Sequence, residues 1–299
     1  MQPCCPRGTT DRRIYAKPGT IARALEGRWR ANTKDLRFRD GPWRYSRRLR
    51  QDYPAQGWKI HVSATVLSAG DVLARARPVL AKHDAPFKVP ARLELLAALN
   101  AGLGQFSQVG KFLTVYPRND AEAINLAREL HAATHGFHGP RIPFDTRYKK
   151  NSLVFYRYGS FFAKGRNGSG GKIVDPAGRV RADVRDRAHA VPKWLKDPFT
   201  KGRIKSKRLR LADSIGMELL PFKAIAQRGK GGVYQAVDLS VSPARLVLVK
   251  EGRRHGETDW LGQDGFARTE REGRVLRDLH RCGLPVLEPI REFTERGNH

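Results

Sequence analysis

Hydrophobic and polar positions follow a mixed strand and helix pattern through the first two thirds of the chain. Residues 57–64 alternate between apolar Trp58, Ile60 and Val62 and smaller or polar neighbours, which is the period of a β-strand with one buried face. The predicted strands cover residues 57–64, 110–117 and 152–158, and the predicted helices cover residues 71–80, 93–99 and 120–134, capped by Ser68 and by Asn119 or Asp120. Because strands and helices do not alternate regularly, the pattern favours an α+β fold without internal repeats.

A second, β-rich pattern begins at Leu219. Strands are predicted at residues 222–225, 233–238 and 245–250, followed by a charged helix at residues 266–279. The chain start is basic and weakly patterned, with one helix predicted around residues 20–31. We therefore expect four segments, which are a basic N-terminal extension (1–53), an α+β domain (54–200), a basic linker (201–215) and a β-rich second domain (216–299).

The charge balance is unusual for a chain of 299 residues. Fifty-seven Lys and Arg residues against 29 acidic ones give a formal net charge of +28, which attracts polyanions. Most basic residues are spread along the chain, as on a solvated surface, but residues 201–210 hold six of them and no acid. No helix-turn-helix, zinc-finger or stacking-aromatic motif accompanies them, so nucleic-acid binding remains an alternative supported by charge alone.

Localisation and metal content follow from what the sequence lacks. No run of 18 apolar residues is present, and the charged first residues do not form a secretory signal. Cys4, Cys5 and Cys282 have the spacing of neither a disulfide framework nor a metal site. We expect a cytoplasmic protein that binds no membrane and has no resident metal.

Cationic side chains gather near the predicted strands of the α+β domain. Lys59 and His61 are two residues apart on one strand and therefore point to the same face. The further members of this cationic set are Lys88 between two prolines, Lys111, Arg147 and Arg157. A crowded cationic pocket would bind a phosphate dianion and lower the pKa of a lysine enough for it to act as a base. On spacing alone, the same residues would also suit an exposed strand face.

The sequence around these residues resembles the lyase domain of class III lanthionine synthetases, which is similar to the phosphothreonine lyases of pathogenic bacteria. The resemblance covers roughly residues 40–200, and the matching strings occur in the same order as in that family. It rests on Gly57-Trp-Lys-Ile-His-Val-Ser-Ala-Thr65, Pro86-Phe-Lys88, Ser107-Gln-Val-Gly-Lys-Phe-Leu-Thr-Val-Tyr-Pro117, Asp145-Thr-Arg-Tyr148, Tyr156-Arg-Tyr-Gly-Ser-Phe161 and Trp194…Asp197-Pro-Phe199.

This resemblance implies a phosphoserine/phosphothreonine lyase that acts on a phosphorylated precursor peptide and leaves dehydroamino acids. Lys88 would be the general base and His61 the general acid, while Lys59 and Arg157 would hold the phosphate. Lys111 and Arg147 would contact phosphate or substrate, with an ordinary solvent-facing cation as the equal alternative.

The second domain resembles the N-terminal lobe of a protein kinase. Gly229, Gly231 and Gly232 stand where a glycine-rich loop covers ATP phosphates, and Lys250 and Glu272 have the spacing of the kinase lysine–glutamate pair. The loop departs from the kinase pattern because only its last glycines are present.

No His-Arg-Asp or Asp-Phe-Gly motif follows before His299. We therefore expect weak ATP binding, Mg²⁺ only in a complete kinase, and no phosphoryl transfer by this chain. The chain would then be a fragment, the product of a broken gene or one part of a split enzyme that a partner chain completes. The alternative to a lyase from another class is a non-catalytic fragment that binds ATP or a leader peptide.

Overall fold

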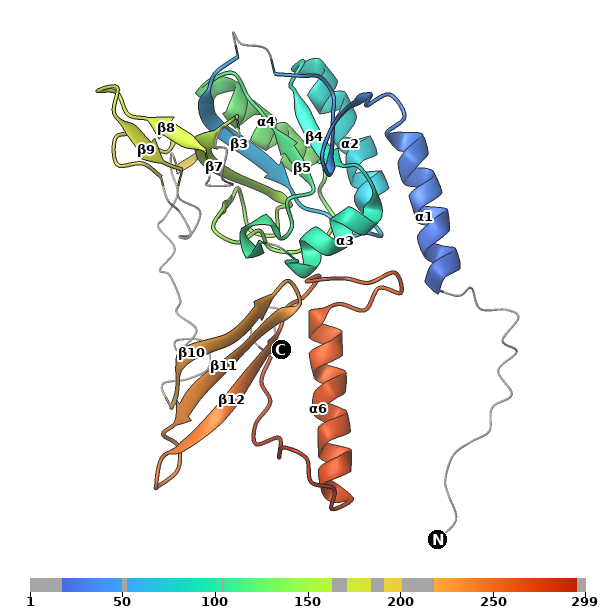
Figure 1. Cartoon of the computed structure of the whole chain (residues 1–299), viewed down its shortest axis with the longest axis vertical. Helices are drawn as coiled ribbons and strands as arrows, with labels where there is room; N and C mark the ends of the chain where they lie inside the picture. The colour runs from blue at the N-terminus through green and yellow to red at the C-terminus, as the bar shows by residue number, and fades with distance from the viewer. Residues whose placement is uncertain are drawn as a thin grey trace.

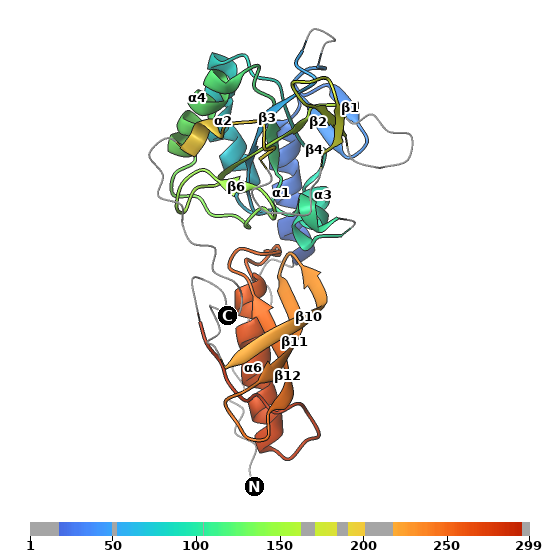
Figure 2. The same cartoon turned by 90° about the vertical axis from the view of Figure 1, so that its left-hand side faces the viewer.

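A computed structural model describes residues 18–49, 53–103, 105–162, 171–183, 191–200 and 218–294 of the chain. These residues form two units, one containing helices α1 to α4 and the other strands β10 to β12 with helix α6 (Figures 1 and 2). The predicted linker at residues 201–215, Cys4 and Cys5 lie outside the described residues.

The first unit is built on a seven-stranded sheet with the order β1-β2-β4-β5-β3-β7-β6, in which every neighbouring pair is antiparallel. Its strands are β1 (Phe38–Asp40), β2 (Trp43–Tyr45), β3 (Gln56–Val62), β4 (Phe87–Pro90), β5 (Leu113–Val115), β6 (Thr146–Arg147) and β7 (Val154–Ser160). A separate hairpin pairs β8 (Lys172–Val174) with β9 (Val180–Ala182).

The helices of the first unit are α1 (Pro18–Asn32), α2 (Ala69–Lys82), α3 (Leu93–Ala101) and α4 (Asp120–Ala133), with single 3-10 turns η1 (Phe106–Gln108) and η2 (Pro198–Thr200). This mixture of helices and antiparallel strands confirms the α+β class. The predicted cap at Asn119 is also confirmed, because its side chain accepts from the backbone N–H of Glu122. Ser68 is the N-cap residue of α2, as predicted, but its hydroxyl accepts from the Thr65 amide at 3.1 Å and makes no capping bond to the helix.

Strand alternation separates the core from the other face of the sheet. Trp58, Ile60 and Val62 of β3 are buried in the hydrophobic core, which also contains Leu126 and Leu130 of α4. The residues between them on β3 therefore point to the opposite face. The hydrophobic core thus fixes which side chains of each strand are available for a site.

The structure differs from the expected 1–53 extension, because the chain joins the first unit from Pro18 onward. Trp29 of α1 is fully buried and packs on Phe112 with ring centroids 5.6 Å apart. Glu26, also on α1, accepts a hydrogen bond from the Leu93 amide at the start of α3. The two strands β1 and β2 extend the sheet beside β4. Strands of three residues with basic flanks give a hydrophobic pattern too weak to recognise from sequence.

The second unit has the predicted order of three strands and a helix. Its elements are β10 (Leu219–Arg228), β11 (Gly231–Asp238), β12 (Arg245–Gly252) and α6 (Gly265–Arg281). The strands form an antiparallel meander, and α6 lies beside it (Figure 1). Across both units, the described helices are all too short or too polar to cross a membrane.

Candidate functional site

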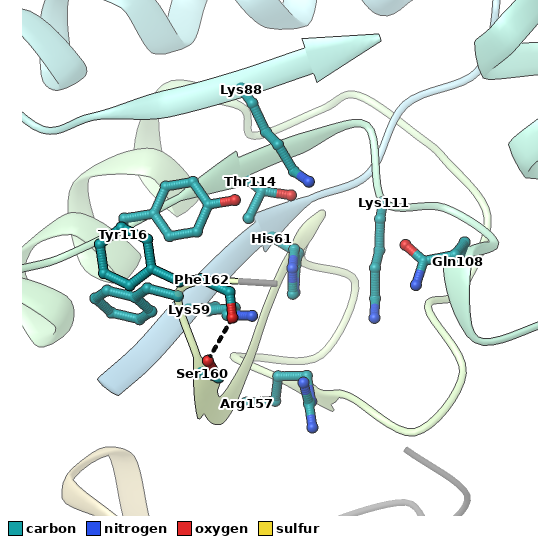
Figure 3. Close-up of a pocket in the computed structure, with 11 residues that line it drawn as sticks. Lys59, His61, Lys88, Gln108, Lys111, Thr114, Tyr116, Arg157, Ser160 and Phe162 are labelled. Carbon is teal, nitrogen blue, oxygen red and sulfur yellow. Dashed lines mark hydrogen bonds between the residues drawn. The ribbon is translucent and has the colours of Figure 1, made fainter. Parts of the chain in front are cut away.

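A cavity of about 140 Å³ lies on the face of the seven-stranded sheet opposite the core. Its lining is mostly polar, and cationic side chains converge on it from several strands (Figure 3). The lining residues are Lys59, His61, Lys88, Gln108, Lys111, Thr114, Tyr116, Arg157, Ser160, Phe161 and Phe162. Four of them, Lys59, His61, Lys88 and Arg157, are the residues to which the sequence assigned catalysis and phosphate binding.

Strand register explains why these residues meet. Lys88 on β4 is directly opposite Thr114 on β5, and Thr114 is directly opposite His61 on β3. One pair further along β3, Lys59 is opposite Arg157 on β7. Residues directly opposite each other in antiparallel strands share a face and lie next to each other. The register therefore places these residues on one face of four adjacent strands, with Arg157 offset by one pair because Phe155 is opposite His61.

His61 is oriented by a buried carboxylate. The distance from its ring Nδ1 to Asp145 Oδ2 is 2.6 Å, and both side chains are almost fully buried. Burial lowers the pKa of His61 to about 4, because the opposing attraction of Asp145 does not offset desolvation and the nearby cations Lys111 and Lys59. The imidazole is therefore neutral at pH 7. An Nδ1–H that donates to Asp145 leaves Nε2 as the acceptor.

Asp145 also holds the other cations of the site. Its Oδ1 lies 3.6 Å from Lys111 Nζ and 4.0 Å from Arg157 Nε. Burial alone would raise the pKa of this carboxyl, but Lys111, His61 and Arg157 outweigh it and hold the pKa below its usual range. Asp145 is thus an anion at the centre of the cationic row, a role that the sequence did not assign.

Arg157 bridges two carboxylates. On the side away from Asp145, its guanidinium faces Asp183, with Nη2–Oδ1 at 2.5 Å and Nη1–Oδ2 at 3.5 Å. Asp183 directly follows β9 and also accepts from the Ser160 amide at 3.3 Å. The flat guanidinium is therefore fixed in one orientation at the edge of the pocket.

The local charge of the pocket is much smaller than that of the whole chain. With Lys88 protonated, the four cationic side chains face the two carboxylates Asp145 and Asp183, so four positive and two negative charges leave +2 while His61 is neutral. A phosphate monoester carries close to two negative charges at neutral pH. The pocket has the charge and the hydrogen-bond donors that such a dianion requires.

The ammonium group of Lys88 lies beside two aromatic rings at one side of the pocket. Its Nζ lies 4.1 Å from the centroid of the Trp43 ring and 5.9 Å from that of Tyr45. A ring face attracts an ammonium group and fixes its direction. Both aromatic residues belong to β2, within the segment expected to be an extension. The sequence therefore missed them as partners of Lys88.

Lys111 and Arg147, for which the sequence left two interpretations, are placed differently. Lys111 is 5% exposed and lines the cavity, so it joins the cationic row. Arg147 does not line the cavity, and its guanidinium covers the ring of Phe155 at 4.9 Å. Burial lowers the pKa of Arg147, and the nearby Arg141 lowers it further. The structure brings together five of the six residues in the cationic set.

The second unit assembles the kinase-like residues in part. Lys250 on β12 forms an ion pair with Glu272 on α6, as the lysine–glutamate arrangement requires. Gly231 and Gly232 begin β11, while the amide of Gly229 donates to the carbonyl of Ala101 in the first unit at 3.1 Å. The ion pair fits an ATP-binding lobe, whereas the Gly229 amide already has a protein partner. Within the described ranges, no group of three His, Cys, Asp or Glu residues could hold a metal ion.

Known proteins match most of this chain. A search of curated proteins finds one described as "Probable SapB synthase" from Streptomyces coelicolor, 34% identical over 270 residues. That alignment covers 88% of this chain but 28% of the relative, so the chain spans little more than a quarter of the relative's length. Residues 21–210 match the family described as RamC, N-terminal domain, and this range includes most of α1 and the whole seven-stranded sheet. The chain therefore belongs to the RamC N-terminal domain family.

Proposed function

We propose that the first unit is a phosphoserine/phosphothreonine lyase of lanthipeptide biosynthesis, related to class III lanthionine synthetases. The observation that carries the proposal is the gathering of Lys88 on β4, His61 and Lys59 on β3 and Arg157 on β7 around one cavity, with Asp145 paired to His61. Relationship to a protein named as a synthase of SapB supports peptide modification as the setting. The substrate would be a ribosomally made precursor peptide carrying phosphorylated Ser or Thr.

Elimination requires one base, one acid and a cationic cradle. Lys88 as a neutral amine takes the Cα proton, the electron pair forms the Cα=Cβ double bond, and the Cβ–O bond breaks. His61 gives a proton to the bridging oxygen, so hydrogen phosphate leaves and dehydroalanine or dehydrobutyrine remains. Lys59 and Arg157, opposite each other on β3 and β7, bind the phosphate oxygens throughout.

Because the pKa of His61 is low, its protonation would depend on substrate binding. With a pKa of about 4 the imidazole is neutral, and an acid in this position must first gain a proton. A phosphate dianion within the pocket offsets Lys59 and Lys111, which both lower the pKa of this imidazole. Substrate binding would therefore raise the pKa of His61 and charge it only when there is a leaving group to protonate.

The second unit is proposed to be the first lobe of a protein kinase domain, with ATP contacting Gly231, Gly232 and Lys250. Its support is the Lys250–Glu272 ion pair together with the order of three strands and a helix. ATP would supply the phosphoryl group that the lyase later removes. Residues 218–299 contain no His-Arg-Asp or Asp-Phe-Gly motif to accept the hydroxyl proton and hold Mg²⁺, so ATP binding by residues 1–299 alone would be weak.

A phosphoserine peptide tests the lyase proposal directly. Purified protein should release inorganic phosphate and leave dehydroalanine, seen as loss of phosphoric acid in the mass spectrum. Lys88→Ala should abolish turnover but keep most peptide binding, because the base acts in the transition state. Lys82→Ala, which removes a lysine on α2 that pairs with Glu129, is the matched control. Turnover by Lys88→Ala at the wild-type rate would exclude this lysine as the base.

The same preparation distinguishes the alternatives to a lyase. Binding of the phosphopeptide without phosphate release would favour a non-catalytic fragment. Binding to DNA that falls steeply with salt, without either peptide effect, would favour the nucleic-acid alternative.

A further inference from the structure

We propose that the glycine-rich turn of the second unit docks on the first unit, and that Gly229 and Arg253 are positioning residues for one wall of the phosphate pocket. That wall consists of residues 108–111, which include Gln108 and Lys111 of the cavity lining. The proposal rests on the proposed lyase function only for its activity measurement, because the docking itself has an independent measurement.

The first contact is between backbones. The tip of the β10–β11 hairpin lies next to the end of α3 (Figures 1 and 2), where Gly229 donates its amide to the carbonyl of Ala101 at 3.1 Å. A Cβ atom at position 229 would overlap the backbone oxygen of Asn100. Glycine is therefore required at position 229 by this close approach, independently of any nucleotide.

Asn100 connects this contact to the backbone of the pocket wall. Its side chain is buried and spans two segments, with Nδ2 donating to Ala64 O at 3.0 Å and Oδ1 accepting from the Gly110 amide at 3.2 Å. Gly110 has φ +76°, and its own Cβ would lie 3.0 Å from Ile142, so its conformation is tightly fixed. The next residue is Lys111. A shift of the α3 end would thus move the backbone that carries Lys111.

A second contact reaches the same wall from another direction. The guanidinium of Arg253 lies 5.5 Å from the ring centroid of Phe106, the first residue of η1. Two hydrogen bonds to Glu251, at 2.9 and 2.7 Å, hold the guanidinium in place. Because η1 ends at Gln108, the arginine supports the pocket wall two residues from the cavity lining.

These two contacts give the glycine-rich turn a function in the lyase. The end of α3 and η1 are joined by a short connection, and the second unit contacts both of them. Undocking would free residues 105–112, and Lys111 would lose its fixed distance to Asp145. Small displacements of charged groups in a catalytic pocket lower rates strongly.

Hydrogen exchange and phosphate release on the full chain test the proposal together. Gly229→Ala should speed amide exchange in residues 105–112 and lower phosphate release from a phosphoserine peptide about tenfold. Gly27→Ala adds the same methyl group at an exposed position of α1, where no atom lies within 4 Å, and should change neither measurement. Unchanged exchange and unchanged release in Gly229→Ala would overturn the proposal.

Arginine variants distinguish a loss of docking from misfolding of the second unit. Arg253→Ala should reproduce the Gly229→Ala effects, and Arg253→Lys, which keeps a cation for Phe106, should restore most of the activity. Arg254→Ala is the matched control, because Arg254 lies 3.9 Å from the ring centroid of Phe266 within the second unit. Equal losses in Arg253→Ala and Arg254→Ala would show a general stability effect and reject the positioning role.

Failure of the lyase proposal would give a different result. If wild-type protein releases no phosphate but Gly229→Ala still speeds exchange at residues 105–112, the docking stands and the lyase assignment falls. If wild-type protein is active and Gly229→Ala behaves like it in both measurements, the lyase stands and the docking falls.

Discussion

Replacing Asp145 with asparagine changes the electrostatics of the pocket while keeping the shape of the side chain. The substitution removes the anion at 2.6 Å from His61 Nδ1 and at 3.6 Å from Lys111 Nζ. The formal charge of the pocket rises from +2 to +3. Phosphate binding and proton transfer should therefore respond in opposite directions.

The size of the effect follows from the contacts that are lost. A hydrogen bond to a charged group contributes about 1.5–3 kcal/mol. If His61 needs that bond mainly when it is protonated, kcat should fall about 10- to 160-fold. Binding of a dianion should instead tighten, because one positive charge is no longer offset. Kinetics should thus show a lower kcat together with a lower dissociation constant for the phosphopeptide.

The difference in stability between wild type and Asp145→Asn should depend on pH. The folded-state pKa of Asp145 is below its usual range, so its contribution is present above the unfolded pKa and is lost as pH falls. Removing one partner of a buried ion pair costs about 3–5 kcal/mol near neutral pH. The difference in urea midpoint between wild type and Asp145→Asn should therefore shrink as the solution is acidified.

Asp183→Asn is a matched control, because it also adds one positive charge but contacts Arg157 and not His61. Phosphopeptide binding should change in the same direction in both variants, and the loss of kcat should be clearly smaller in Asp183→Asn. Equal kcat losses in the two variants would mean that charge alone controls the rate. Wild-type kcat in Asp145→Asn would refute the orienting role of this carboxylate.

Three further predictions concern single residues. Arg157→Lys should weaken phosphopeptide binding by about 1.5–3 kcal/mol, because a lysine cannot donate to the phosphate and also keep both contacts to Asp183. Equal affinities by calorimetry would show that Arg157 is a structural cation only. Sulfate, whose charge is constant between pH 5 and 7, should raise the pKa of His61 above about 4 in an NMR titration and should bind more tightly at lower pH. An unchanged His61 pKa in the presence of sulfate would contradict the proposed proton uptake. Radiolabel from ATP should not reach any peptide through this chain alone, and transfer that disappears in Lys250→Ala would show a complete kinase site.

Period-two alternation was enough to predict the orientation of the site residues. Trp58, Ile60 and Val62 mark the core face of β3, so Lys59 and His61 had to share the other face, and the structure places both in the cavity. The orientation on β3 depends on a short segment whose own pattern fixes its geometry. The Lys250–Glu272 ion pair instead joins β12 to α6, and it was expected from the resemblance to a kinase lobe.

The partners of those residues depend on tertiary structure and were not predictable. Asp145 begins the string Asp145-Thr-Arg-Tyr148, yet nothing in the sequence shows that its carboxylate lies 2.6 Å from the His61 ring, directly after Phe144 with φ +65°. Trp43 meets Lys88 only because a three-residue strand pairs with β4. The cationic set itself could have indicated a buried carboxylate. Several cations close together in a buried pocket require a nearby negative charge.

That compensation also explains why the overall charge of +28 was a poor guide to the site. A surface charge is solvated and attracts any polyanion, whereas Lys59 and Lys111 are nearly fully buried and water screens their charges much less. Uncompensated cations at such short distances would repel one another and destabilise the fold. Asp145 and Asp183 reduce the excess to about the charge of one phosphate group, which matches the single dianion of the proposed substrate better than a polymer. The number of buried carboxylates, more than the number of basic residues, defines what this pocket can bind.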